Sequence, residues 1–240
     1  MLQEYKLYEG KEIIRFDEVR HSFWNQKGER LIGVTSATGV IDKSGPLMYW
    51  AVNTTRDYLL DLLKRGIKIT ETEIETASKQ HRIFKKKAAD IGTAIHEWVA
   101  NWIDGKKPEM PDNEKVVNGI TAFLKFQKEH KFKWIESERV VYSKKYKFAG
   151  FLDAVALDKK SRYLVDFKSS KGIYSPMLFQ TAGYQLAYEE EIGKKFDKRI
   201  IIKFGKEDGN FEVMELNDYE KDKEAFLSAL NLKRRLKELD

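Results

Sequence analysis

An aspartate and a lysine stand two residues apart at the end of an apolar run, in the sequence LVDFK. A second carboxylate, Asp153, lies in the preceding apolar stretch. The carboxylates of Asp153 and Asp166 are hard oxygen ligands that suit a divalent cation, and the Phe167 carbonyl could add another oxygen. The ammonium of Lys168 could orient an attacking water and stabilise developing negative charge. The alternative is a solvated ion pair on an edge strand, which any short Asp-x-Lys pattern allows.

Two predicted strands position these side chains. Residues 148–157 are rich in apolar and small side chains, a polar DKKS turn follows, and residues 162–168 form the second strand. Because alternate residues of a strand face opposite sides, Asp166 and Lys168 share one face and Phe167 takes the other. We expect the aspartate of the first strand to meet this pair across the hairpin.

Composition excludes several classes of protein. The chain has 240 residues, enough for a sizeable core, and its 42% hydrophobic and 12% aromatic content argues against disorder. It has no cysteine, which excludes disulfides, thiolate zinc sites and iron–sulfur clusters. The net charge of +6 permits a polyanionic partner. No apolar run has the length of a membrane span and no signal peptide is recognisable. We therefore expect a cytoplasmic or other intracellular protein.

The order of predicted elements indicates an α/β protein of the α+β kind, with a mixed β-sheet flanked by helices. Short strands are predicted between residues 12 and 41, including GVTSATGV, and two helices follow. We expect one domain over residues 1–240. Residues 1–89 would form an N-terminal β-hairpin and helical arm, and residues 90–240 the core. Pro46 opens the first helix of the arm, and a Thr70–Glu73 capping box opens the second.

Four short patterns occur in order along the chain: Gly92-x-x-x-His96, Gly150-x-x-Asp153, Asp166-x-Lys168 and Gln180-x-x-x-Tyr184. The ordered set resembles the PD-(D/E)XK nuclease superfamily, and within it the RecB-like exonuclease branch. The resemblance covers about residues 90–188. The segments HSFW and GVTSATGVI near the N-terminus are similar to phage-encoded and mitochondrial genome-maintenance members.

This resemblance implies a restriction-endonuclease-like core and a deoxyribonuclease that uses Mg²⁺ or Mn²⁺. His96, Asp153, Asp166 and the Phe167 carbonyl would hold the metal, and Lys168 would act with them in catalysis. Taken alone, His96 fits a core-edge histidine bonded to a carbonyl. The RecB-like arrangement, with a helical histidine over the carboxylates, makes it a metal ligand. These ligands suit one or two metal ions.

The chain departs from the family pattern in three places. Leu152 precedes Asp153 where the family name has proline, and Asp166 stands where glutamate is commoner. The cysteines of relatives that hold an iron–sulfur cluster are missing. The phage or mitochondrial type, from a bacterial or phage-infected cell, is therefore favoured. Glu138 lies on the strand before the hairpin, where we expect a structural salt bridge.

The expected partner is DNA, with single strands or frayed ends preferred and digestion proceeding from an end. Candidate DNA-binding side chains are Gln180, Tyr184, Lys85, Lys86, Lys87 and Lys145. Tyr184 could stack on an unpaired base, and the lysines could wall a groove. The chain has no nucleotide-binding P-loop, so a helicase or recombination partner would be another polypeptide.

Three other functions stay open. The same fold could serve as a non-catalytic DNA-binding or assembly module, or as a metal-dependent endonuclease. A hydrolase of small phosphate esters also fits the charges, but not the long basic helix. All positions of the family pattern are present in this sequence, which favours the exonuclease.

Overall fold

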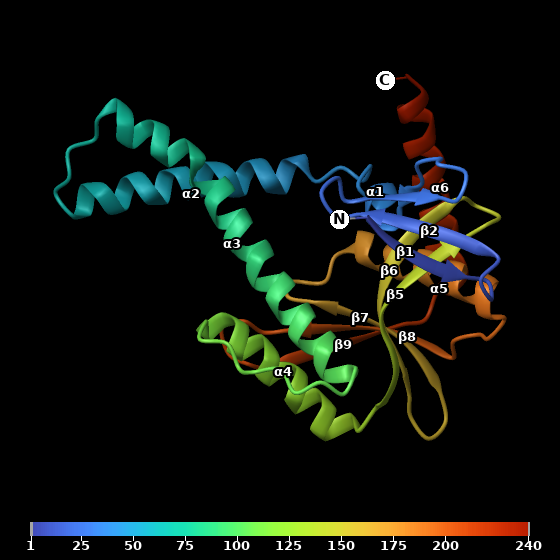
Figure 1. Ribbon diagram of the computed structural model, residues 1–240. Helices are drawn as coiled ribbons and strands as arrows, with labels where there is room; N and C mark the ends of the chain where they lie inside the picture. Colours follow the sequence, from blue (N-terminus) through green and yellow to red (C-terminus); the bar gives the residue numbers. More distant parts are fainter. Residues whose placement is uncertain (1, 240) are drawn as a thin grey trace. The chain divides into compact units, whose positions relative to one another are not determined.

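A mixed six-stranded sheet is the centre of the larger of two units that the computed structural model shows within residues 2–239. The larger unit contains the residues up to Ile41 and those from Ile95 onward, and the smaller one spans Asp42–Ala94. The sheet consists of β4 (Ile32–Gly33), β5 (Lys133–Ser143), β6 (Phe148–Leu157), β7 (Arg162–Lys168), β8 (Lys198–Phe204) and β9 (Phe211–Leu216). The predicted α+β class is confirmed at this level (Figure 1).

Strands β6 and β7 begin and end at the predicted residues. They pair antiparallel, while β7 and β8 pair in parallel and β8 and β9 antiparallel. On its other edge, β6 pairs antiparallel with β5 from Lys133 to Ser143, with a register shift between Trp134 and Glu136. The parallel β7–β8 step requires a crossover, which α5 (Ser175–Ile192) supplies.

Three helices cover one face of the sheet: α1 (Val34–Thr38), α5 and α6 (Tyr219–Leu239). Buried residues of all three join Leu152 and Leu164 of the sheet in one hydrophobic core. The helix α1 corrects the expectation of a strand at GVTSATGV. Its β-branched residues favour a strand locally. Val34 and Ala37 are three residues apart, and a helix places both on the side that is buried in this core.

The opposite face carries an aromatic cluster under α4 (Glu114–His130). Phe123 of α4 packs edge-on against Phe167 and Phe204 of the sheet and against Trp102 of α3 (Glu71–Ile103). Asn113 caps α4 by accepting hydrogen bonds from the backbone N–H groups of Lys115 and Val116. This packing fixes the end of α3 that carries His96.

A separate three-stranded sheet precedes these elements. Its strands are β1 (Leu2–Leu7), β2 (Glu12–Asp17) and β3 (Ser22–Asn25), paired antiparallel in that order. Ile14, Phe16 and Phe23 of this sheet share a core with Val140 of β5 and Ala149 of β6. The small sheet therefore belongs to the same unit as the central one.

The smaller unit contains α2 (Ser44–Lys64) and the first part of α3. Trp50 packs edge-on against His81, and the Thr55 hydroxyl donates to the carbonyl of Ala77. One of the two bonds of the predicted capping box is present, since the Thr70 backbone N–H donates to the Glu73 carboxylate, and the Thr70 hydroxyl donates to the same oxygen.

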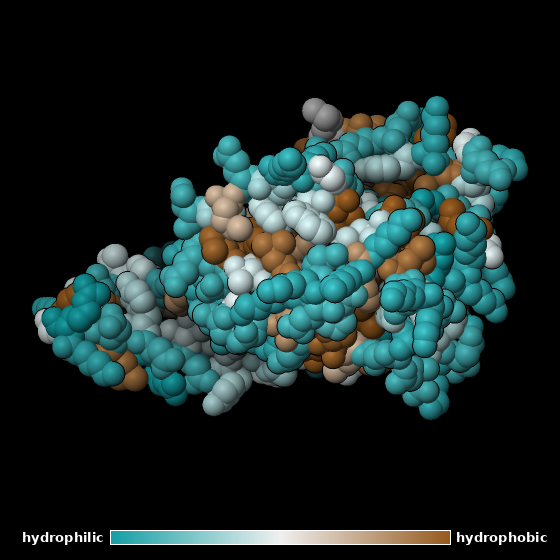
Figure 2. Space-filling model, turned by 90° about the horizontal axis from the view of Figure 1, so that it is seen from below, coloured by the Kyte–Doolittle hydropathy of each residue, from teal (hydrophilic) through white to brown (hydrophobic). Residues whose placement is uncertain are grey.

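Charged and polar side chains dominate the face of the molecule drawn in Figure 2, with hydrophobic residues in smaller groups between them. Charged residues make up 34% of the sequence, which agrees with this surface. None of the helices between residues 2 and 239 combines the length and apolar character that crossing a membrane would need.

Candidate metal centre

Strand β6 changes its partner along its length. Its first two residues pair with β4 and its last four with β7. Between these ladders, residues 150–153 of β6 and residues 166–168 of β7 form a fork without pairing to each other. The Asp153 Oδ2 atom accepts a hydrogen bond from the Phe167 backbone N–H at 2.7 Å, in place of a ladder bond. Continuing the β6–β7 register by one residue places Asp153 beside Asp166.

Asp166 and Lys168 form a buried ion pair at this fork. The Asp166 Oδ2 atom lies 2.5 Å from Lys168 Nζ, and the Asp166 residue is only 1% exposed. Apart from this ion pair, neither carboxylate oxygen has a hydrogen-bond partner. Burial raises the pKa of Asp166 to about 7; the Lys168 charge opposes this rise and Asp153 adds to it. Burial acts to lower the pKa of Lys168, but the two aspartates outweigh it and the pKa is raised.

His96 and Glu138 complete the cluster on the other side of Asp153. The His96 Nδ1 atom lies 3.8 Å from Asp153 Oδ1, and the imidazole stands edge-on to the Phe167 ring. One ligand atom from each of His96, Glu138 and Asp153 lies within 4.8 Å of the others. The structure therefore brings together His96, Asp153, Asp166 and Lys168, as the sequence predicted.

The salt bridge expected for Glu138 is wrong. Glu138 is exposed, and within residues 2–239 its carboxylate has no ion pair and no hydrogen bond. Partial loss of hydration at the cluster raises its pKa to about 8, and the Asp153 charge adds to the effect. Its backbone is left-handed, with φ at +44°. Such a conformation costs about 1–3 kcal/mol in a non-glycine residue and tends to occur at functional sites.

Strands β5 and β6 both depart from the regular alternation of side chains near Glu138. Leu152 and Val155 of β6 lie three residues apart, yet both enter the core under α5. On β5, Glu136 accepts a hydrogen bond from the Tyr188 hydroxyl, and Arg139 lies over the same ring. Residues three apart point to opposite sides of a regular strand, so both strands are irregular between these positions. Sequence periodicity carried no signal of this, because the irregularity involves both strands together.

Gln180 and Tyr184 contact each other as their four-residue spacing predicts. The Gln180 Nε2 atom donates to the Tyr184 hydroxyl at 2.8 Å. The Tyr184 residue is 4% exposed, and its ring lies against Gly150, where an added Cβ would come within 2.7 Å of it. Stacking of this ring on a base does not fit that burial. The glycine in β6 is the sequence feature that could have revealed the contact, since a glycine inside a strand often marks a close approach.

The candidate DNA-binding lysines fall in different parts of the chain. Lys85, Lys86 and Lys87 lie on α3 in the smaller unit, where they are exposed and have no ion pair with any residue from 2 to 239. Lys145 is exposed on the β5–β6 turn, with its ammonium over the Tyr146 ring. Its neighbour Lys144 is paired with Glu12 at 3.0 Å. The α3 cluster is thus the less neutralised of the two groups.

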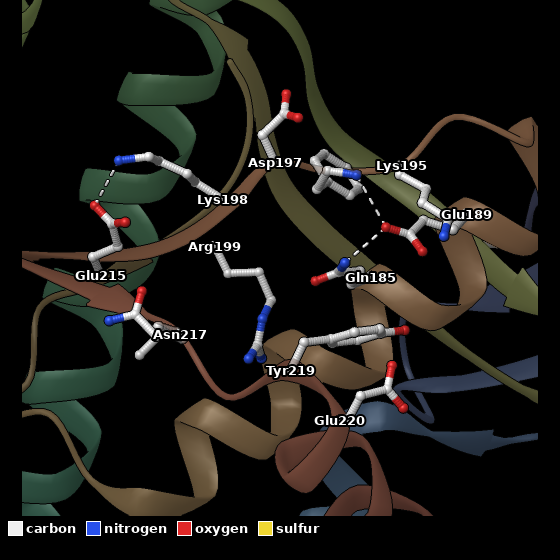
Figure 3. A pocket seen from close by; sticks show the side chains of 12 residues that line it. Gln185, Glu189, Lys195, Asp197, Lys198, Arg199, Glu215, Asn217, Tyr219 and Glu220 are labelled. Atoms are coloured by element: carbon white, nitrogen blue, oxygen red, sulfur yellow. Dashed lines mark hydrogen bonds and ion pairs between the residues drawn. The ribbon is translucent and has the colours of Figure 1, made fainter. Parts of the chain in front are cut away.

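A cleft of about 270 Å³ lies on the larger unit between the ends of β8, β9, α5 and α6 (Figure 3). Its charged side chains are largely compensated within the protein. Lys198 pairs with Glu215 at 3.0 Å, and the buried Arg199 pairs with Asp222 at 2.7 Å. None of the residues of the candidate metal centre lines this cleft.

Comparison of the chain with protein-family models and with curated protein sequences finds no match. The candidate centre is therefore supported by its own geometry.

The donor set of the fork fits a divalent cation. It combines the Asp166 carboxylate, of which only Oδ2 has a partner, the carboxylates of Asp153 and Glu138, and one imidazole. The only cation among these side chains is Lys168, which leaves the cluster with excess negative charge in a partly buried place. Carboxylate oxygens suit Mg²⁺ and Mn²⁺, and the imidazole shifts the preference toward Mn²⁺.

Proposed function

We propose that the chain is a divalent-metal-dependent deoxyribonuclease built on a restriction-endonuclease-like core, and that it digests DNA from ends. The observation that carries the proposal is the fork. It holds Asp153 beside a buried Asp166–Lys168 pair, and within residues 2–239 it gives the Asp166 carboxylate no partner other than Lys168. A buried carboxylate oxygen without a partner, such as Asp166 Oδ1, is costly in a purely structural role, whereas a bound metal ion would satisfy it.

Hydrolysis of a phosphodiester requires an activated water, neutralisation of the non-bridging oxygens and stabilisation of the leaving alkoxide. Asp153, Asp166, the Phe167 carbonyl and His96 would hold Mg²⁺ or Mn²⁺, which supplies Lewis-acid stabilisation of the phosphate and acidifies water. Lys168 stays protonated because its pKa is raised, so its ammonium is suited to stabilising negative charge at the phosphorus centre. The hydrogen bond from Phe167 to Asp153 fixes the carboxylate before substrate arrives.

DNA is favoured as the substrate by exposed cations without acidic partners. Lys85, Lys86 and Lys87 can neutralise phosphates, and Lys145 offers a further ammonium. Gln180 is half-buried beside Tyr184 and can contact a nucleotide backbone or base edge. We infer a preference for single-stranded or frayed ends. A helicase or recombination protein would supply such ends from another chain.

The test is degradation of matched linear single-stranded, linear duplex and closed circular DNA with Mg²⁺, with Mn²⁺ and with chelator. Metal-dependent loss of linear single strands is expected, with circular DNA left intact. The substitutions Asp166→Asn and Lys168→Met should each lower the rate at least about 100-fold. Glu129→Gln, at an exposed residue of α4 without an ion pair, is the control and should leave the rate unchanged.

Three outcomes would contradict parts of the proposal. Near-normal cleavage by the purified Asp166→Asn variant would show that Asp166 is not needed for catalysis. Circular DNA cut as fast as linear DNA would indicate an endonuclease. Binding of DNA without cleavage under any metal would indicate a non-catalytic module.

A further inference from the structure

We propose that Glu138 is a metal ligand, and that with His96 and Asp153 it forms a second cation position that shares Asp153 with the position at Asp166. The inference rests on the metal centre of the proposed function and deepens it. The four-pattern set that identifies the fork does not include Glu138, whose expected role was a salt bridge. The ligand class is a divalent cation that accepts one nitrogen and several oxygens, for which Mn²⁺ is the best match.

The first support is the spacing of the ligand atoms. Two ligands of one Mg²⁺- or Mn²⁺-sized cation lie at most about 4.2 Å apart, twice a metal–oxygen distance of about 2.1 Å. The His96–Asp153 pair, at 3.8 Å, is already inside this limit. All three ligand atoms lie within 4.8 Å of one another. Side-chain movements of a few tenths of an ångström would therefore bring all three within bonding distance of one cation.

The second support is the unsatisfied state of Glu138. Its carboxylate has neither an ion pair nor a hydrogen bond with residues 2–239, and its acidic neighbours are Asp153, Glu97 and Asp104. Glu138 is exposed, but an acid surrounded by three other acids favours the uptake of a proton or a cation.

The third support is the backbone of Glu138. Its φ of +44° is strained for a residue with a side chain, and glycine would adopt it without cost. The strained residue lies in β5, two residues beyond the register shift of the β5–β6 ladder between Trp134 and Glu136. The register on either side pairs Ser137 with Ala154 and Arg139 with Leu152, so Glu138 stands directly across from Asp153.

The two oxygens of Asp153 explain how one residue serves two positions. The Oδ1 atom faces His96, at 3.8 Å, whereas the Oδ2 atom is held by the Phe167 N–H on the β7 side. Asp166 and Lys168 occupy that second side, and Asp166 is not in the His96–Glu138–Asp153 group. The geometry thus gives one position with mixed nitrogen and oxygen ligands and another with oxygen ligands alone.

The experiment measures the number of Mn²⁺ ions bound per chain, and not the rate of DNA cleavage. Metal-free protein is titrated with Mn²⁺, and free Mn²⁺ is read from its electron paramagnetic resonance signal. The unsubstituted chain should bind two ions, and their proximity should broaden the bound signal, because paired ions of such sites lie about 3.5–4 Å apart. Glu138→Gln should bind one ion without that broadening. Asp166→Asn should lose the other ion, and the control Glu129→Gln should keep both.

Circular dichroism verifies that each variant is folded. If Glu138→Gln fails to fold, Glu138→Gly takes its place, because glycine suits the left-handed backbone and removes the carboxylate. Unchanged Mn²⁺ stoichiometry and affinity in the Glu138 variants would overturn the inference, as would a single ion in the unsubstituted chain. Two bound ions, of which one is lost in Glu138→Gln, without DNA cleavage would support this site while the proposed function fails.

Discussion

Asp153 and Phe167 lie on strands that have stopped pairing, yet a 2.7 Å hydrogen bond from the Phe167 N–H to the Asp153 carboxylate joins them. The aspartate therefore has a structural task and a chemical one. One oxygen satisfies a backbone donor that the fork would leave unpaired, and the other faces His96. An aspartate can do both because its carboxylate has two independent acceptor atoms.

Replacement of Asp153 should separate these two tasks. Asp153→Asn keeps an oxygen for the Phe167 N–H and should retain stability while weakening Mn²⁺ binding. Asp153→Ala leaves that donor unpaired and should cost about 1–3 kcal/mol more than the asparagine variant. Both substitutions remove the same negative charge, so the difference between their free energies of unfolding reports the hydrogen bond. Equal free energies of unfolding of the two variants in urea would show that this hydrogen bond does not stabilise the fold.

Gly150→Ala should destabilise the fold. The added Cβ would lie 2.7 Å from the Tyr184 ring and 2.9 Å from a Val34 methyl group, and both of these side chains are buried. Overpacking of this kind costs about 1–3 kcal/mol. The matched control is Gly45→Ala in α2, where no atom lies within 4 Å and alanine favours the helix. A melting temperature of Gly150→Ala equal to that of the control would contradict the close contact.

Stability of the metal-free protein should fall as the pH rises from about 4 to about 8. Burial raises the pKa of Asp166 from 3.8 to about 7, and partial loss of hydration raises that of Glu138 from 4.5 to about 8. In that window the folded chain binds more protons than the unfolded chain, so the free energy of unfolding decreases with pH. Thermal melts in chelator should show a drop of at least about 3 °C between pH 6 and pH 8.5.

The variants Asp166→Asn and Glu138→Gln should each flatten this pH dependence, because each removes one of the two titrating groups. Added Mn²⁺ should restore stability most strongly at the higher pH, where both carboxylates are ionised and free of protons. A melting temperature that rises between pH 6 and pH 8.5 in chelator would contradict the raised pKa values.

The hairpin of β6 and β7 was predictable from sequence, because an apolar run, a polar turn and a second apolar run are each strong local patterns. The Asp166–Lys168 pair followed from strand alternation alone. The helix at α1 was not predictable, since its valine and threonines favour strands and only burial of Val34 and Ala37 decides its shape.

The role of Glu138 was hidden for a different reason. Its position depends on a local irregularity shared by two strands and on a left-handed backbone at a residue that rarely adopts one. Tyr184 lies between these cases. Its spacing from Gln180 on α5 could be read from the sequence, but its burial depends on contact with Gly150 of β6, which only the folded structure reveals.

The lysines of α3 should set the salt dependence of DNA binding. Each phosphate neutralised on a single strand contributes about −0.7 to the slope of log K against log salt concentration. Removing three contacts, in the variant Lys85→Ala, Lys86→Ala and Lys87→Ala, should therefore make the slope shallower by about 2. The matched control replaces Lys27, Lys159 and Lys160, which are exposed turn lysines without ion pairs among residues 2–239. Fluorescence anisotropy with a labelled single strand, at several salt concentrations, measures both slopes. Equal slopes for the two triple variants would show that the α3 cluster does not contact the phosphate backbone.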